Sequence, residues 1–285
     1  MLLLYFKIQG CRMGFGSIVA KINSLPPFPQ SIIKLEEAFR VGEPNMKTIV
    51  SIIEGDPLLT AAILAKVNAP VFGLKQHIVS VLQAVTLFGL NTVRASALKA
   101  AMERNFEIDM SPYAISNEDF SKISAMQTAL MFQWYMGVDV QRAKIMIPIS
   151  FIMEMGKVLI AKEVVESSYG DMFRDELIQS SSIEHVEDDF AGITSAKVCA
   201  LLFRHWNFET LFAQLMESVD AKEEEIDGMI KDMVLGLKAV RAAVNVKEQL
   251  SDASIEEGAK IVRRMGYDST RFVNAAHRIR ENMGR

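Results

Sequence analysis

IVSIIEGDPLLTAAILAKVNAPVFG, residues 49–73, predicts two helices separated by a sharp turn. Asp56 is a residue type favoured at helix N-caps, and Pro57 suits the first helical position, where its missing N–H costs nothing. The second helix carries apolar residues at helical spacing, which form one stripe: Leu58, Ala61, Ala62 and Ala65. We therefore expect residues 49–73 to fold as helices that pack through their apolar residues.

The same periodicity extends outward in both directions. A helix is predicted from Gln30, after the proline-rich PPFP at 26–29. Ser80 and Gln83 form a capping-box pattern, and Gly89 is suited to end that helix. Asn91 is expected to cap the next helix. No period-two alternation with hairpin turns is found, so the sequence predicts an all-α protein.

Three further features concern later helices. A helix is expected from about Asn117, and the one after it contains Pro148, which should kink or divide it. An acidic-then-apolar helix is expected over 222–246, and MGYDS at 265–269 should separate two shorter helices. The acidic stretch AKEEEIDG at 221–228 indicates either the start of a C-terminal subdomain or a helix first turn favoured by the dipole.

Composition excludes several classes. The chain has 285 residues, of which 50% are hydrophobic and 23% charged, and its net charge is −4. This length is enough for one or two domains with a core. The basic clusters RR at 263–264 and HRIR at 277–280 are expected to be exposed helix faces, so we expect no nucleic-acid partner.

Cysteine usage and the N-terminus bear on location. Cys11 and Cys199 are the two cysteines, far apart in sequence, which favours a reducing cytoplasm. The first six residues are apolar but are not preceded by a positive charge, and they are too few to span a membrane. We expect an N-terminal extension over 1–13 and no membrane span, and translation from Met13 is an alternative to Met1.

Four short motifs occur in a characteristic order, in SLPPFPQSIIKLEE (24–37), in 49–73 and in IVSVLQAVTLFGLNTVR (78–94). Together they resemble the HDOD family, the HD-related output domains of bacterial signalling proteins. The matching positions are Leu25, Pro26, Pro27, Pro29, Asp56, Pro57, Leu58, Asn68, Ala69, Gln83, Ala84, Val85, Leu87 and Gly89. The resemblance implies mainly structural roles for these residues.

The likeness continues into the second half. FIMEMGKVLIA at 151–161 resembles the family's Gly-Leu-Leu-His-Asp-Ile-Gly-(Arg/Lys) helix, and GITSAKVCALLFRHWNF at 192–208 resembles a later segment that ends in Trp. The resemblance implies an HD-domain, phosphodiesterase-like helical bundle. We expect an HDOD domain over 14–210, divided into an N-terminal bundle (14–105) and an HD-like bundle (106–210), with helices at 211–285 that complete or pack on the latter.

The HD position itself is degenerate. Related HD phosphohydrolases hold metal with a His-Asp pair, where this chain has Met153 and Glu154, followed by Gly156 and Lys157. Ser195 stands where many family members have His. A thioether is a poor ligand for hydrolytic metals, so we expect no catalytic residues, metal or cofactor. Glu154 is expected to be solvated or paired with a neighbouring Lys.

Histidines are too few to rebuild the metal site. The chain has four: His77, His185, His205 and His277. His185 lies in IEHVEDD, where a metal cluster is an alternative to a polar connection. His205 lies at a helix end, and the other two are expected at the surface. Lys157 is expected to extend along its helix toward solvent.

The resemblance implies a non-catalytic signalling module that contacts other signalling proteins in trans and affects motility or virulence. One alternative is a divergent nucleotide phosphohydrolase that uses Glu154 with Asp188 or Asp189 to bind Mg²⁺ or Mn²⁺. A second alternative is a nucleotide sensor with Lys157 as a phosphate contact.

Overall fold

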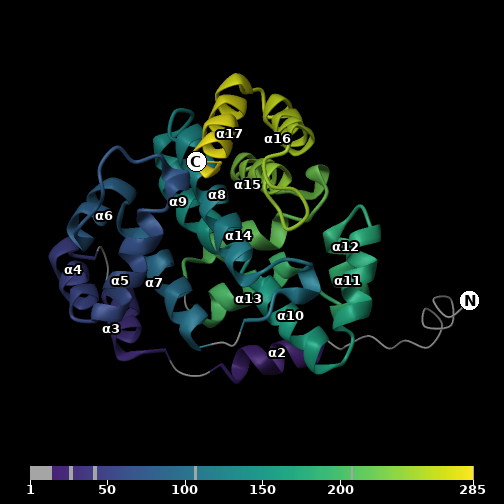
Figure 1. Ribbon diagram of the computed structural model, residues 1–285, viewed down its shortest axis with the longest axis horizontal. Coiled ribbons are helices and arrows are strands. Elements are labelled where there is room, and N and C mark those ends of the chain that lie inside the picture. Colours follow the sequence, from purple (N-terminus) through teal and green to yellow (C-terminus); the bar gives the residue numbers. More distant parts are fainter. Residues whose placement is uncertain (1–14, 26–27, 41–43, 106–107, 207, 285) are drawn as a thin grey trace, which may run out of the picture. The chain divides into compact units, whose positions relative to one another are not determined.

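The computed structural model describes residues 15–25, 28–40, 44–105, 108–206 and 208–284. The expected N-terminal extension, both alternative start positions, Cys11, and the signature residues Pro26 and Pro27 lie outside the described residues. Within these ranges the chain is helical and forms no strand; Val244 and Gln249 make one isolated antiparallel bridge. The all-α prediction is confirmed (Figure 1).

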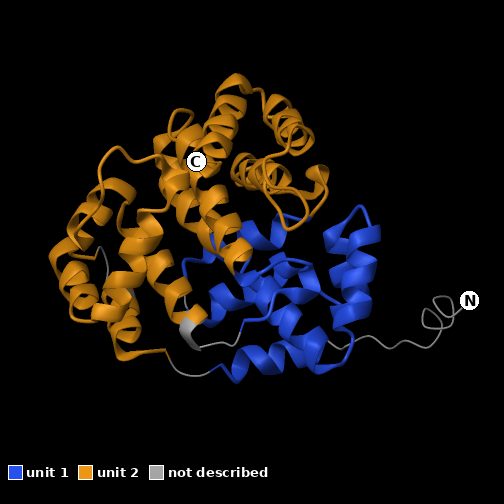
Figure 2. Cartoon of the chain, viewed as in Figure 1, with its two compact units in different colours: residues 1–25, 108–117, 154–220 blue, residues 26–107, 118–153, 221–285 orange. Residues whose placement is uncertain are grey.

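The chain forms two compact units, each built from separated segments (Figure 2). Unit 1 comprises residues 1–25, 108–117 and 154–220, and unit 2 comprises 26–107, 118–153 and 221–285. The expected boundaries 14–105, 106–210 and 211–285 stay a prediction about domain organisation.

Unit 1 contains seven of the helical elements in the described residues. They are α2 (Phe15–Asn23), the 3-10 turn η2 (Ser111–Tyr113), α10 (Gly156–Glu166), α11 (Gly170–Gln179), α12 (Ile183–Ala191), α13 (Ser195–His205) and α14 (Thr210–Ser218). Helix α10 packs against α2, α11, α12, α13 and η2, so it is the central element of this unit.

Unit 2 contains the other helices. They are α3 (Gln30–Arg40), α4 (Met46–Glu54), α5 (Pro57–Val67), η1 (Pro70–Phe72), α6 (Val81–Phe88), α7 (Leu90–Asn105), α8 (Asn117–Tyr135, whose first residue falls in unit 1), α9 (Val140–Ile152), η3 (Glu223–Glu225), α15 (Lys231–Ala243), α16 (Asp252–Arg264) and α17 (Thr270–Met283). Helices α3 to α6 gather at one end, and α15 to α17 form a second group (Figure 1).

Several signature residues form hydrogen bonds at the ends of helices. The Asp56 carboxylate accepts hydrogen bonds from Leu59 N (3.0 Å) and from Ser31 Oγ (2.7 Å), and Pro57 begins α5. Asn68 joins α5 to the start of α6: its Nδ2 donates to Ile78 O and its Oδ1 accepts from Ile78 N, both at 2.8 Å. These bonds satisfy backbone groups that helix ends leave unpaired.

The next helix is also capped as predicted. Ser80 Oγ accepts a hydrogen bond from Gln83 N at 3.2 Å, and Gln83 Oε1 accepts one from Val79 N at 2.9 Å. Gly89 ends α6 with φ of +83°, a conformation that glycine adopts without steric cost. Leu25, which follows α2 in unit 1, and Pro29, which directly precedes α3 in unit 2, are half-buried.

Several local expectations are wrong. Helix α5 buries Leu59, Ile63 and Val67, whereas the predicted stripe includes the exposed Leu58, Ala61 and Ala65. The face that α5 buries is chosen by packing on α4, α6 and α7, because this helix is apolar on most of its circumference.

Helix boundaries also differ from expectation. Helix α7 begins at Leu90, so Asn91 lies in its first turn rather than at its cap. Pro148 does not divide α9, which runs from Val140 to Ile152, and the chain turns at residues 153–155. The stretch 222–246 is not one helix, because Asp227 Oδ1 accepts from Met229 N (2.9 Å) in a turn before α15. Residues 265–269 separate α16 from α17, as predicted.

Candidate functional site

The degenerate HD position lies at the start of α10, in unit 1. Glu154 and Lys157 are three residues apart, a spacing that places two side chains on one helical face. Their side chains are 2% and 1% exposed, and Lys157 Nζ lies 2.8 Å from Glu154 Oε2. Glu154 is therefore paired with a neighbouring Lys rather than solvated. The expectation that Lys157 extends to solvent is wrong, because neighbouring elements enclose α10.

A second carboxylate approaches the same ammonium from α12. Glu187 is fully buried, and its Oε1 lies 3.3 Å from Lys157 Nζ. Tyr113 Oη donates a hydrogen bond to the same Oε1 at 3.0 Å. The other carboxylate oxygen, Oε2, accepts from Ser195 N at 2.6 Å. Glu187 therefore connects η2, α12 and α13 to the lysine on α10.

Ser195 completes the surroundings of the ammonium. Lys157 Nζ donates a hydrogen bond to Ser195 Oγ at 2.8 Å, and both side chains are buried. Ser195 is the first residue of α13, whose N-cap is Thr194. The Lys157 ammonium also lies 5.7 Å from the centroid of the Tyr113 ring, within the range of a cation–π attraction.

Gly156 allows α10 and α13 to approach each other closely. A Cβ added at this residue would lie 1.9 Å from the carbonyl oxygen of Ser195 and 3.0 Å from Cys199 N. No side chain fits that space, so glycine is required here for a reason of packing. This contact sets the position of Lys157 relative to Ser195. Met153, the other residue of the degenerate pair, is buried.

We refer to Tyr113, Glu154, Lys157, Glu187 and Ser195 as the lysine-centred cluster. Its three charged groups are two carboxylates and one ammonium, all nearly inaccessible to water. Buried charges are costly unless they are paired and hydrogen-bonded. Here each carboxylate is within 3.3 Å of the ammonium, which supplies the positive charge between them.

This donor set does not fit a divalent metal. Hard divalent cations bind oxygens at about 2.0–2.6 Å and need most of the surrounding positions for ligands or water. The space between Glu154, Glu187 and Ser195 is instead taken by Lys157 Nζ. Among the described residues, no group of three or more His, Cys, Asp and Glu side chains is placed to hold a metal.

The predicted carboxylates next to His185 do not gather at the site. His185 is 67% exposed, and its Nε2 lies 3.4 Å from Asp189 on the same helix. Asp188 is exposed as well. Of the acidic residues in this stretch, only Glu187 is buried. The spacing of the buried Ile183, Val186 and Glu187 could have identified it, because these positions share one helical face.

A second polar cluster, not predicted from the sequence, lies in unit 2 around Asp232 of α15. Its carboxylate accepts hydrogen bonds from Tyr135 Oη and from Tyr267 Oη (3.1 Å), and pairs with Arg142 at 2.6 Å. Burial, and then the hydrogen bond to Asp232, raises the pKa of Tyr135 far above its usual range. Burial beside Asp232 also raises the pKa of Tyr267.

Membrane-spanning potential is limited in the described residues. No single helix there has the length and apolar character needed to cross a bilayer. One pair, α4 and α5, meets the criteria jointly by length and composition, with a bend of 110° between its members.

Comparison with solved structures identifies the fold. A phosphohydrolase candidate from Shewanella amazonensis SB2B aligns with a TM-score of 0.65 and 16% identity, covering 94% of this chain and 94% of that chain. A virulence factor from Campylobacter jejuni aligns with a TM-score of 0.59 and 19% identity, covering 95% and 97%. A candidate signal transduction protein from Marinobacter aquaeolei VT8 aligns with a TM-score of 0.64 and 16% identity, covering 91% and 58%.

At these identities the structures show a shared fold, and the HD-like helical bundle expected from the sequence is confirmed. No curated protein sequence matches the chain. The sequence model of the HDOD domain matches residues 25–222, which is more than half of the chain. The expected family is therefore confirmed: this chain belongs to the HDOD family.

Proposed function

We propose that this chain is a signalling module without catalytic activity, which acts by contact with separate signalling proteins. The observation that carries the proposal is the position of Lys157. Its ammonium lies among the oxygens of Glu154, Glu187 and Ser195, at the place where the family likeness puts the metal ligands of related hydrolases.

The chemistry of an ammonium explains why this arrangement favours a regulatory role. A hydrolytic metal site keeps an open position for water, whose pKa the ion lowers, and it polarises the phosphoryl oxygen. A lysine ammonium has no vacant coordination position and holds its own hydrogen-bond acceptors. Glu154 is 2% exposed and bound to Lys157, so its carboxylate is not accessible to a substrate.

The proposal also covers the cellular location of the protein and its biological role. The chain has only two cysteines among its 285 residues, which fits a reducing cytoplasm. Structural similarity to a Campylobacter jejuni virulence factor and to a candidate signal transduction protein supports a role in signalling that influences motility or virulence. No metal or cofactor is part of the proposed mechanism.

An assay of turnover tests the proposal. The full chain and Glu154→Ala are incubated with mono-, di- and cyclic nucleotides and with an aryl phosphodiester, each with Mg²⁺ or Mn²⁺. We expect no hydrolysis above the rate without protein. Metal-dependent hydrolysis by the wild type that is lost in Glu154→Ala would establish the alternative, a divergent phosphohydrolase.

A further inference from the structure

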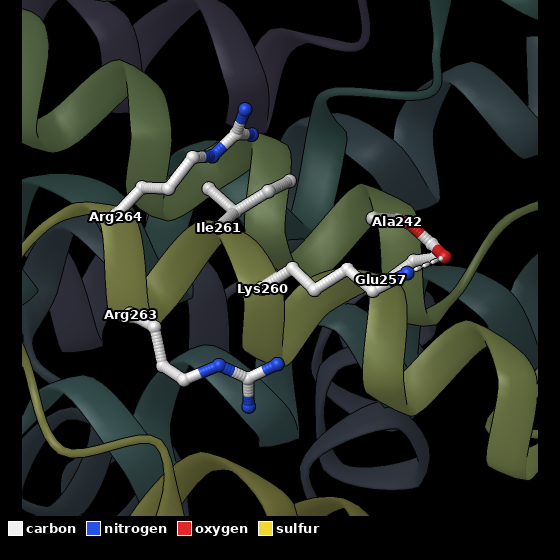
Figure 3. Close-up of a pocket in the computed structure, with 6 residues that line it drawn as sticks. All are labelled: Ala242, Glu257, Lys260, Ile261, Arg263 and Arg264. Carbon is white, nitrogen blue, oxygen red and sulfur yellow. Dashed lines mark hydrogen bonds and ion pairs between the residues drawn. The ribbon is translucent and has the colours of Figure 1, made fainter.

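Unit 2 contains a depression of ≈ 590 Å³ beside α15 and α16 (Figure 3). Its lining residues come from the end of α15 and the second half of α16: Ala242, Glu257, Lys260, Ile261, Arg263 and Arg264. This volume lies within the range of pockets that hold small ligands or a few side chains. The two apolar residues, Ala242 and Ile261, give it an uncharged part.

Three cations line the depression. Lys260, Arg263 and Arg264 follow the i, i+3, i+4 spacing of one helical face. Their side chains are 53%, 47% and 61% exposed. Figure 3 shows Arg263 and Arg264 extending on either side of Ile261, with Lys260 directed toward Glu257. The two arginines therefore flank Ile261, and Ala242 lies beside Glu257.

Each of these cations has a carboxylate nearby that a ligand can replace. Lys260 lies 2.6 Å from Glu257, Arg264 lies 3.9 Å from Glu223, and Arg263 pairs with Glu256. Exposed pairs of this kind contribute about 0–1 kcal/mol each. A ligand that presents several carboxylates at once can exchange with them at small cost.

The distribution of charge also favours an acidic partner. Residues 258–285 contain seven Lys and Arg and two Asp and Glu, a net charge of +5. The complete chain carries −4, so the preceding 257 residues carry −9. The lining residues themselves, three cations and Glu257, have a net charge of +2, which attracts acidic partners.

We propose that this depression binds an acidic segment of a partner protein, with an apolar side chain against Ala242 and Ile261 and flanking carboxylates on Arg263 and Arg264. Guanidinium groups suit carboxylates because they donate two parallel hydrogen bonds. Nucleic acid is disfavoured, since no aromatic residue in the described part of the chain lines the depression for base stacking. The inference rests on the proposed function, because it supplies that function with a partner surface.

The test uses the full chain and a fluorescein-labelled peptide, Glu-Glu-Leu-Glu-Glu, with fluorescence anisotropy as the measurement. The variant Lys260→Glu/Arg263→Glu/Arg264→Glu should weaken binding at least about tenfold. Lys162→Glu/Arg174→Glu/Arg204→Glu makes the same charge change on exposed side chains of unit 1 and should leave the affinity unchanged. The milder Arg263→Gln/Arg264→Gln should also weaken binding, which guards against a folding defect in the triple variant.

Three results would overturn the inference. They are no saturable binding of the peptide by the wild type below about 1 mM, equal weakening in the unit 1 control, and tighter binding of a labelled oligothymidylate that is lost in the same α16 variant. None of these results affects the turnover assay, so failure of this inference and failure of the proposed function are distinguishable.

Discussion

Lys157 Nζ lies 2.8 Å from Glu154 Oε2 and 3.3 Å from Glu187 Oε1, and all three side chains are buried. Related hydrolases place a metal between carboxylate and imidazole ligands, whereas this chain places the end of its own lysine between two glutamates. The cation is covalently part of the fold, so it cannot dissociate or exchange. The buried Lys157 ammonium therefore accounts both for the structural role of the cluster and for the absence of catalysis that we propose.

Removal of the ammonium should destabilise the protein. In Lys157→Met, Glu154 and Glu187 remain buried without a cation, and breaking a buried pair in this way costs about 3–5 kcal/mol. The measurement is the free energy of unfolding in urea. Lys162→Met is the matched control on the same helix, because Lys162 is 44% exposed and should change stability by no more than about 0.5 kcal/mol. Equal stability of Lys157→Met and the wild type would contradict a structural role.

Glycine at position 156 should be essential to packing. Gly156→Ala would place its Cβ 1.9 Å from the Ser195 carbonyl oxygen, so α10 and α13 must separate. We expect a loss of about 3 kcal/mol or more in the free energy of unfolding, at the upper end of the cost of overpacking. Gly16→Ala in α2 is the control, because nothing lies within 4 Å of its added Cβ, and it should be neutral or stabilising. A Gly156→Ala variant as stable as Gly16→Ala would show that the close approach is not required.

The Asp56 signature residue should act through its helix cap. Asp56→Ala removes the acceptor for Leu59 N and for Ser31 Oγ, and loss of such a cap costs about 0.5–2 kcal/mol. Thermal unfolding should show a lower midpoint for this variant, whereas Asp188→Ala, at an exposed position without a cap, should be close to the wild type. If the two variants melted at the same temperature, the motif would need an explanation other than capping.

The cluster around Asp232 should give a specific dependence on alkaline pH. Tyr135 has a raised pKa in the folded state, and its value in the unfolded chain is about 10. Above about pH 10 the unfolded chain therefore releases a proton that the folded chain retains, and ionisation favours unfolding. The stability that Tyr135 contributes is present below this pH and declines as the pH rises further.

Tyr135→Phe isolates this effect. The difference in unfolding free energy between wild type and variant should be constant from about pH 7 to 9 and should narrow toward about pH 11. Urea unfolding at several pH values measures it. A difference that stays constant over the whole range would mean that the ionisation of Tyr135 is not coupled to folding.

Local signals in the sequence predicted much of the fold. The features that the sequence did not predict depend on contacts between helices. Asp56 and Gly89 could be assigned because a cap or a positive φ depends on one or two residues. The break at 153–155 and the buried face of α5 depend on neighbouring helices, so Pro148 and Leu58 were misleading. Lys157 illustrates the same limit, because a lysine between apolar residues suits both a solvent-directed side chain and a buried pair.

The candidate site was predicted in part. The resemblance to HDOD proteins identified Glu154, Gly156, Lys157 and Ser195, which the fold brings together. Glu187 had a usable signal, its place on a buried helical stripe, but the surrounding acidic residues and His185 concealed it. Tyr113 comes from the irregular segment before α8, and no pattern in the sequence indicates that it reaches Glu187.

The metal content of the full chain, purified without chelators or an affinity tag, tests the central claim most directly. Elemental analysis should find fewer than about 0.1 divalent ions per chain, because the Lys157 ammonium takes the place that an ion would need. About one or two ions per chain, lost in Glu154→Ala, would contradict the account and direct attention to substrates.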